Sequence, residues 1–143
     1  MKVKDKMTKS VASVTPDTTV EQVAQLMEKH NIGAIPVVDQ DNLVGIVTDR
    51  DIVIRNIAEG KDPKTTPVSS VMTTHVVSVT PDADVNEVAD KMAQNQIRRV
   101  PVVENNKLVG ILSIGDIATD RMFDMEASKA LTEISKPARP EQM

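Results

Sequence analysis

The apolar residues of this chain follow two periods, and both periods recur in the second half of the sequence. Alternating apolar positions over about residues 10–15 and 75–80 predict strands that stop at a Pro turn. An apolar residue at every third or fourth position then predicts one face of a helix in each half. We expect this face to pack in the core; its positions are Val20, Val23, Ala24 and Met27 in the first half and Val85, Val88, Ala89 and Met92 in the second.

Two further apolar runs follow each helix and predict a pair of strands. The runs are AIPVV (34–38) and LVGIVT (43–48) in the first half, and RVPVV (99–103) and LVGILS (108–113) in the second. The turns between them, DQDN and ENNK, contain the Asp and Asn residues that suit a tight connection. Because Pro36 and Pro101 have no N–H to donate, their strand should lie at a sheet edge or leave that position unpaired.

The two halves are copies of one repeat. Residues 3–52 align with residues 68–117 without a gap, and about 23 of the 50 positions are identical. Each repeat predicts the order strand, helix, strand, strand, helix, and the last helix of the first repeat runs from about Asp49 to Ala58. The predicted domains are a first repeat (1–58), a polar Pro-containing linker (59–67), a second repeat (68–124), and a C-terminal helix with a frayed tail (125–143). We expect neither half to be stable alone, because about 65 residues form a marginal core.

Each repeat ends its last strand with a hydroxyl residue that is followed three positions later by Asp. These pairs are Thr48 with Asp51 in GIVTDRDI, and Ser113 with Asp116 in GILSIGDI. One interpretation is a capping box, in which the hydroxyl caps a helix and the Asp reaches back to the N–H of the capping residue. The other is a polyol and phosphate site, because orphan N–H groups and the helix dipole favour an anion there. The motif alone leaves both interpretations open.

The composition argues against several classes of function. With 17 basic and 21 acidic residues mixed along the chain and a net charge of −4, the basic surface of a nucleic-acid-binding protein is missing. The chain has no Cys and only two His residues, which argues against a thiolate nucleophile or a metal site. No apolar run approaches a membrane span, and the N-terminus lacks the apolar core of a signal peptide, so we expect a cytoplasmic protein. No acid and base pair converges, so we expect no enzyme and no catalytic residues.

The order of these motifs resembles the cystathionine-β-synthase (CBS) domain, present here as a tandem pair, or Bateman module. The matching elements are MT, VxxVTPD, an amphipathic helix, hPVV, LVGIhT or LVGIhS, and a closing DI, where h is hydrophobic, and they cover residues 3 to about 122. The resemblance implies an α/β (α+β) fold of two βαββα repeats, packed by their sheets about a pseudo-twofold axis with two clefts between them. It also implies that the clefts hold adenosine-containing ligands such as AMP, ADP, ATP or S-adenosylmethionine, and that the pair acts as an energy or metabolite sensor.

The same resemblance gives the Thr48–Asp51 and Ser113–Asp116 motifs a role in ligand binding. The two Asp residues would accept hydrogen bonds from the ribose, since one carboxylate can accept from both hydroxyls of a cis-diol. Thr48 and Ser113 would lie near the ribose and phosphate, and the adenine would occupy an aliphatic slot whose backbone groups read the base edge. The expected slot residues are Val11, Ala34, Ile35, Pro36 and Val37 in the first repeat, and Val76, Arg99, Val100, Pro101 and Val102 in the second.

The repeats differ in their candidate phosphate ligands. Arg98 and Arg99 precede the VPV of the second repeat, where the first has Gly and Ala, whereas Arg50 lies in the first repeat's motif, where the second has Gly. Arg suits phosphate because its planar fork donates two parallel hydrogen bonds, although each could equally be a solvated surface residue. We expect phosphates on a nucleotide at one repeat's Asp to point toward the other repeat's basic residues, so that the Asp51 cleft receives Arg98 and Arg99.

Two functions from different classes remain open. The first is a regulatory module that binds adenine nucleotides or S-adenosylmethionine and signals to a separate protein, since the repeats consume almost the whole chain. The second is a structural or interaction module with empty clefts. No cofactor beyond the regulatory ligand is expected. Bateman modules generally pair into a disc of four repeats, so the resemblance implies a homodimer. A further amphipathic stripe in the tail could pack on its own subunit or assist this pairing; it consists of Ala127, Ala130, Leu131 and Ile134.

Overall fold

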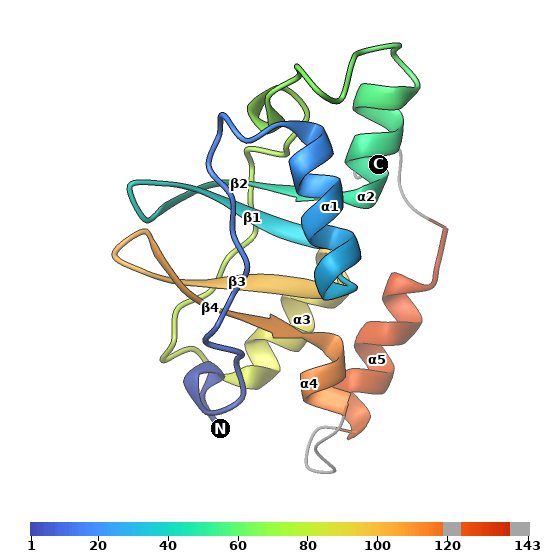
Figure 1. Ribbon diagram of the computed structural model, residues 1–143. Coiled ribbons are helices and arrows are strands. Elements are labelled where there is room, and N and C mark those ends of the chain that lie inside the picture. Colours follow the sequence, from blue (N-terminus) through green and yellow to red (C-terminus); the bar gives the residue numbers. More distant parts are fainter. Residues whose placement is uncertain (119–123, 138–143) are drawn as a thin grey trace. The chain divides into compact units, whose positions relative to one another are not determined.

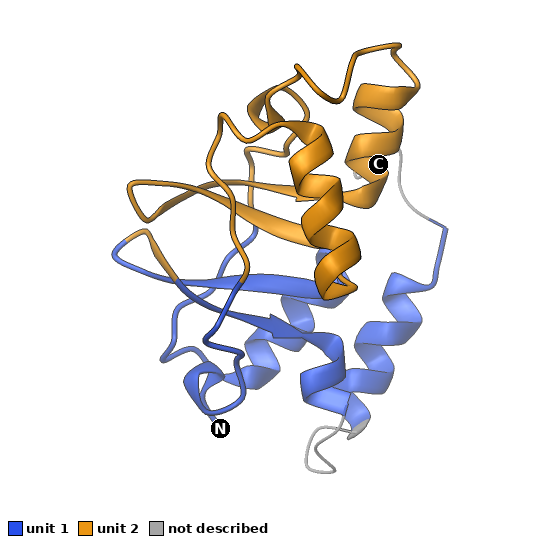
Figure 2. Cartoon of the chain, in the orientation of Figure 1, with its two compact units in different colours: residues 1–11, 77–105, 109–143 blue, residues 12–76, 106–108 orange. Residues whose placement is uncertain are grey.

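The structure, a computed structural model, describes residues 1–118 and 124–137 and contains two compact units. Figure 1 shows the helices and strands, and Figure 2 shows the two units. Unit 1 consists of residues 1–11, 77–105 and 109–143, and unit 2 consists of residues 12–76 and 106–108. The mixed α/β class predicted from the sequence is confirmed. The expected packing about a pseudo-twofold axis concerns the placement of the units and stays a prediction.

Unit 2 packs one helix on an antiparallel hairpin. Helix α1 spans Val20–His30, strand β1 spans Ala34–Asp39, and strand β2 spans Asn42–Thr48. Gln40 and Asp41 join the strands with φ angles of 51° and 68°, which fit a tight two-residue turn. The core is aliphatic, as the composition requires, and consists of Val14, Val20, Val23, Met27, Ile35, Val37, Val47, Ile52, Val68 and Val71.

Unit 1 repeats this plan and adds a further helix. Its elements are α3 (Val85–Asn95), β3 (Arg99–Glu104), β4 (Lys107–Ser113), α4 (Ile114–Ala118) and α5 (Asp124–Ile134). The β3–β4 turn has the same positive φ angles, at Asn105 and Asn106. Its core consists of Val3, Val79, Val85, Val88, Ala89, Met92, Val100, Val102, Leu112, Ile117 and Ala127.

Helix α5 settles where the apolar stripe of the tail packs. It lies against α3 and α4 within unit 1, where Ala127 and Ala130 are buried and the Gln96 amide donates to the Glu133 carbonyl at 3.1 Å. Because α5 covers α3, Ala89 is buried, whereas its counterpart Ala24 on α1 is exposed. The prediction of Ala24 as a core residue was therefore wrong. The sequence predicts a helix from Ile117 to Phe123, and the part of it after Ala118 lies outside the described residues.

The spacing of Thr19 with Gln22 and of Asp84 with Glu87 predicts capping boxes at the starts of α1 and α3. The first box is confirmed, whereas Asp84 caps α3 through Asn86 and not through Glu87. The Thr19 hydroxyl and the Gln22 side chain form a reciprocal capping box at α1. At α3 the Asp84 carboxylate accepts a hydrogen bond from the N–H of Asn86 at 2.9 Å. These caps satisfy backbone donors that have no partner inside the helix.

The first predicted strand of each repeat is reduced to one parallel bridge. Val14 donates to the Pro36 carbonyl at 3.1 Å, and Val38 donates to the Val14 carbonyl at 2.8 Å. The next bonds of a parallel ladder would need the N–H of Pro36 on one side and of Pro16 on the other, and neither exists. The bridge of Val79 with Val102 is bounded in the same way by two Pro residues. The predicted strands were therefore too long.

The start of the second repeat completes unit 2. The short helical turn η3 (Val68–Ser70) and Val71 lie in the unit 2 core, with Val68 and Val71 both 0% exposed. Ile46 and Thr73 then exchange two backbone hydrogen bonds of 2.9 and 2.8 Å. This segment packs closely on β2 at Gly45, where an added Cβ would lie only 2.5 Å from the Met72 sulfur. The compact unit therefore extends past the end of the first repeat.

The start of the first repeat completes unit 1 in the same manner. The turn η1 (Val3–Asp5) buries Val3 in the unit 1 core, and Thr8 exchanges backbone hydrogen bonds with Ile111. The N–H of Val85, the first residue of α3, donates to the carbonyl of Met1 at 3.1 Å. The repeats thus exchange their opening segments, and the compact units cut across the domain boundaries drawn from the sequence.

The linker predicted at residues 59–67 is attached to unit 2. The Thr66 and Pro63 carbonyls accept hydrogen bonds at 3.0 Å from the N–H groups of Val20 and Glu21, the first two residues of α1. The Thr66 hydroxyl in turn donates to the Asp62 carbonyl at 2.7 Å. The segment therefore supplies acceptors for the start of α1 that side chains would otherwise have to provide.

The predicted helix over Asp49–Ala58 is present, but its geometry changes midway. It begins as α2 (Asp49–Ile52) and continues as a π-helical turn, η2 (Val53–Ile57). The turn places the Asn56 side chain at 0% exposure, and among the described residues its amide nitrogen and oxygen have no hydrogen-bond partner. It also leaves three branched side chains about half exposed, namely Val53, Ile54 and Ile57.

Candidate functional site

The strand-to-helix corner of each unit is a capping box. In unit 2 the N–H of Thr48 donates to Asp51 Oδ2 at 2.9 Å, and the N–H of Asp51 donates to Thr48 Oγ1 at 3.1 Å. In unit 1 the corresponding bonds of Ser113 and Asp116 are 2.9 and 3.2 Å. The capping interpretation of the sequence motif is therefore confirmed in both copies.

The capping box does not use the whole Asp51 carboxylate. Its Oδ2 accepts the backbone hydrogen bond, while Oδ1 lies 3.9 Å from Arg55 Nε, and the side chain is 15% exposed. The cap fixes the orientation of the carboxylate, and Oδ1 keeps acceptor capacity for a further donor. A capping role and a ligand-binding role are therefore compatible at this corner.

The aliphatic slot is narrower than the sequence suggested. Four of its predicted members are 0% exposed within the cores of their units, namely Ile35, Val37, Val100 and Val102. Their side chains are therefore not available to a ligand, and only their backbone groups could contact one. The alternation along β1 and β3 places Ala34 with Pro36, and Arg99 with Pro101, on the opposite face. Pro36 and Pro101 are buried there as well, so Ala34 and Arg99 are the partly exposed residues of these two pairs. Val11 belongs to unit 1 and Val76 to unit 2, each apart from the strand with which the sequence grouped it, so their place in a slot stays a prediction.

Arg98 and Arg99 lie in the same unit as the Ser113–Asp116 corner. The N–H of Ile114, the residue after Ser113, donates to the Arg98 carbonyl at 2.8 Å. Neither guanidinium has an ion-pair partner within residues 1–118 and 124–137. Arg50 is exposed at the unit 2 corner. The expected approach of Arg98 and Arg99 to the Asp51 cleft concerns both units and stays a prediction.

Asp49 is a corner residue that the sequence analysis did not single out. Its N–H donates to the Gly33 carbonyl at 3.0 Å, and its carboxylate Oδ1 accepts from the N–H of Arg50 at 2.8 Å. Oδ2 lies 3.0 Å from the position of a Cβ built on Gly33, so the carboxylate rests against that glycine. A comparison of the two repeats could have identified Asp49, because the equivalent residue in the second repeat is Ile114. Likewise, the equivalent of Gly33 is Arg98.

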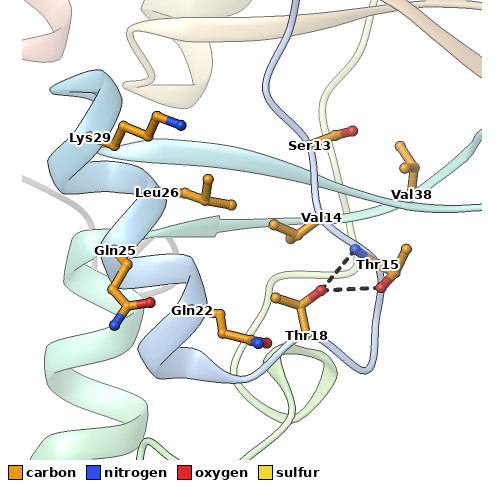
Figure 3. A pocket seen from close by; sticks show the side chains of 9 residues that line it. All are labelled: Ser13, Val14, Thr15, Thr18, Gln22, Gln25, Leu26, Lys29 and Val38. Atoms are coloured by element: carbon orange, nitrogen blue, oxygen red, sulfur yellow. Dashed lines mark hydrogen bonds between the residues drawn. The ribbon is translucent and has the colours of Figure 1, made fainter.

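A separate hollow of about 610 Å³ lies in unit 2 between α1 and the segment before it (Figure 3). Its lining residues are Ser13, Val14, Thr15, Thr18, Gln22, Gln25, Leu26, Lys29 and Val38. At its edge the Thr15 hydroxyl donates to Asp17, which holds the pKa of that carboxyl below its usual value. In the second repeat the counterpart of Leu26 is Lys91, whose ammonium donates to the Ser78 carbonyl at 3.3 Å. This hollow contains none of the residues predicted to bind a ligand.

The described residues contain neither a membrane-spanning helix nor a cluster of metal-ligating side chains. None of their helices has the length and apolar character needed to span a membrane. In the same part of the chain, no three His, Cys, Asp or Glu side chains come together as a possible metal site.

Comparison with known proteins places these features in a family. The CBS domain model matches residues 3–56 and 68–121. The CBS domain-containing protein YhcV of Bacillus subtilis is 50% identical over 133 residues, covering 93% of this chain and 94% of the relative. Hypoxic response protein 1 of Mycobacterium tuberculosis is 40% identical over 116 residues, covering 80% of this chain and 81% of the relative.

Solved structures agree with this placement. The crystal structure of Hypoxic Response Protein I with two coordinated zinc ions has a TM-score of 0.78 at 38% identity, covering 83% of this chain and 98% of that one. The CBS domain pair of protein MJ0100, in complex with 5′-methylthioadenosine and S-adenosyl-L-methionine, has a TM-score of 0.74 at 32% identity, covering 88% and 98%. With two matched domains, a duplicated corner motif and these relatives, the chain belongs to the CBS domain family as a tandem CBS pair.

Proposed function

We propose that this CBS pair is a regulatory module that binds adenosine-containing ligands at its two strand-to-helix corners and signals to a separate protein. The observation that carries the proposal is the capped Asp51 carboxylate, which is held in place by one oxygen and presents the other. The same backbone frame surrounds Asp116 in unit 1. The similarity to a CBS pair solved with 5′-methylthioadenosine and S-adenosylmethionine supports adenosine as the shared part of the ligand.

The chemistry of the corner suits a ribose. A cis-diol offers two O–H donors, and an ionised carboxylate is an acceptor without a competing donor. A charge-assisted hydrogen bond of this kind contributes about 1.5 to 3 kcal/mol. Because the cap already fixes the carboxylate, little rotamer entropy is lost when the ligand binds. The ligand acts as a regulator in this proposal, since no residue at the corner supplies an acid and base pair.

Signalling requires a surface that a protein partner can contact. The exposed residues Val53, Ile54 and Ile57 form an apolar patch directly after the Asp51 corner, on the same helical segment. We propose that a second copy of the chain covers this patch in a cytoplasmic homodimer, and that an energy or metabolite signal reaches the patch through α2. The patch also favours the second candidate function, an interaction module that works without a nucleotide.

The absence of Trp, Tyr and Cys provides a direct test of ligand binding. The protein itself should be nearly transparent at 280 nm, so a bound adenine would dominate the spectrum near 260 nm. We expect the purified chain, after saturation with ATP or S-adenosylmethionine and gel filtration, to carry an absorbance peak near 260 nm that is lost on denaturation and ultrafiltration. The peak should be absent from a variant with both Asp51→Asn and Asp116→Asn.

A matched control separates the corners from the hollow beside α1. Leu26→Lys places in the hollow the side chain that the second repeat carries there, and it should leave the 260 nm peak unchanged. A peak that survives the double Asn substitution but is lost with Leu26→Lys would move the ligand to the hollow. A wild-type chain that retains neither ligand would instead favour the interaction module.

A further inference from the structure

The two corners share one backbone frame but differ in charge. Their hydrogen bonds match in pairs, including the bond from Asp49 to the Gly33 carbonyl and the bond from Ile114 to the Arg98 carbonyl. Because these hydrogen bonds match, the side chains placed on the two frames can be compared position by position. The unit 1 corner can therefore serve as a reference for the unit 2 corner.

The charges at the five equivalent positions differ by two units. In unit 2, positions 33, 34, 49, 50 and 51 carry two carboxylates and one guanidinium, which gives a formal charge of −1. In unit 1, positions 98, 99, 114, 115 and 116 carry one carboxylate and two guanidinium groups, which gives +1. Arg55, whose Nε lies 3.9 Å from Asp51 Oδ1, brings the unit 2 corner to neutral, and without Asp49 that corner would be as positive as the one in unit 1.

The position of Asp49 directs its charge toward the proposed ligand. Its carboxylate rests against Gly33, which precedes Ala34, the half-buried first residue of β1. It is one residue from Thr48, the side chain expected near the ribose and its 5′ substituent. A triphosphate would bring negative charge toward a carboxylate there, whereas the sulfonium and ammonium groups of S-adenosylmethionine would bring positive charge.

Resting on the proposed function, we propose that Asp49 makes the Thr48–Asp51 corner select adenosine compounds whose 5′ substituent is uncharged or cationic. The Ser113–Asp116 corner, with Arg98 and Arg99 on its own unit and Ile114 in place of Asp49, selects the phosphorylated compounds. This assignment departs from the expectation drawn from the sequence, in which Arg98 and Arg99 serve the Asp51 cleft. One chain can then respond to two chemically different adenosine ligands at once. The preference weakens as salt is raised, because Asp49 is exposed to solvent and its field is screened over about 8–10 Å.

The test isolates the unit 2 corner in the full chain. A parent variant carries Asp116→Asn, which weakens binding at the other corner, and it is titrated calorimetrically with S-adenosylmethionine, ATP and adenosine. Adding Asp49→Asn should lower the affinity for S-adenosylmethionine about three- to tenfold and raise that for ATP by a similar factor, as expected for one partly screened charge. Adenosine, which has no charged 5′ group, should bind with unchanged affinity.

The matched control is Asp39→Asn, which removes the same charge at the other end of β1. Five residue steps of about 3.4 Å place it about 17 Å from Ala34, beyond the screening length, so no ligand should respond. Equal changes for all three ligands with Asp49→Asn would show a structural role and overturn the inference, as would no change for any. If adenosine itself fails to bind the parent and the wild type, the proposed function fails and the inference with it.

Discussion

A cut at the boundary between the sequence repeats should leave neither fragment folded. The fragment of residues 1–66 contains the whole first repeat and its helix α1, but it lacks Val68, Val71 and the backbone partner of Ile46. The fragment of residues 67–143 contains the second repeat but lacks Val3 and the backbone partner of Ile111. Each fragment therefore carries a segment that the other fragment's core requires.

The structure gives the size of the loss. Val68 and Val71 are both 0% exposed, and burying one such side chain contributes about 1.5 to 3 kcal/mol, so the pair contributes about 3 to 6 kcal/mol. The two backbone hydrogen bonds between Ile46 and Thr73 add about 0.5 to 1.5 kcal/mol each. A whole domain is stable by only about 5 to 15 kcal/mol, so the loss is comparable with the total.

Far-ultraviolet circular dichroism and urea titration can measure the outcome. We expect residues 1–66 and 67–143 to lack a cooperative transition separately, and to recover helical signal when mixed in equal amounts. A fragment of residues 12–76, which follows the compact unit, should be more helical than residues 1–66 despite its similar length. Cooperative unfolding of residues 1–66 alone, at the urea midpoint of the full chain, would refute this reasoning.

Three further changes test separate parts of the account. Asp51→Asn keeps a cap acceptor, so the free energy of unfolding should fall by no more than about 0.5 to 1 kcal/mol, while the affinity for adenosine should drop about tenfold. Equal adenosine affinities of variant and wild type in calorimetry would argue against a ribose-binding role of Asp51. Asn56→Leu should raise the free energy of unfolding by about 1 to 2 kcal/mol in urea titration, because it removes a buried amide that has no hydrogen-bond partner among the described residues. A urea midpoint below that of wild type would show that the amide is hydrogen-bonded in solution. A hydrogen bond from Lys4, together with the charges of Lys4 and Lys2, holds the pKa of Asp82 below its usual 3.8. The stabilisation from Asp82 is thus present above that pH and lost as pH falls through the lower folded pKa, so the stability difference between wild type and Asp82→Asn should shrink below about pH 4.

The parts of the fold that were predictable from sequence depend on local patterns. The capping boxes at Thr19, Thr48 and Ser113 involve residues three positions apart, so their spacing is visible in the sequence. The helix faces were visible for the same reason. The error at Ala24 arose because its exposure depends on α5, a distant helix with no counterpart in the first repeat.

The exchange of opening segments was not predictable from the pattern. Residues 3–8 and 68–73 share their apolar positions, since Val3 corresponds to Val68 and Met7 to Met72. Either segment has the apolar residues needed to fill either core. Which core each segment enters therefore depends on the tertiary structure and not on the local sequence pattern. The shortened first strands were predictable in principle, because the sequence shows the Pro residues that remove the required N–H donors.

The role proposed for Asp49 is not visible in the sequence pattern. A change from Ile114 to Asp49 is one substitution among many in the alignment. It gains meaning only when the structure places the carboxylate against Gly33, at the corner that begins with Thr48.

Binding of an adenosine compound through the two capped Asp residues is the central claim, and one calorimetric comparison tests it most directly. Wild type and the double variant Asp51→Asn with Asp116→Asn are titrated with adenosine, which removes charge effects of the 5′ group. The account predicts saturable binding to wild type and an affinity at least about tenfold lower for the double variant, with the folded state of both verified by urea titration. Saturable binding of equal affinity to both proteins would contradict it.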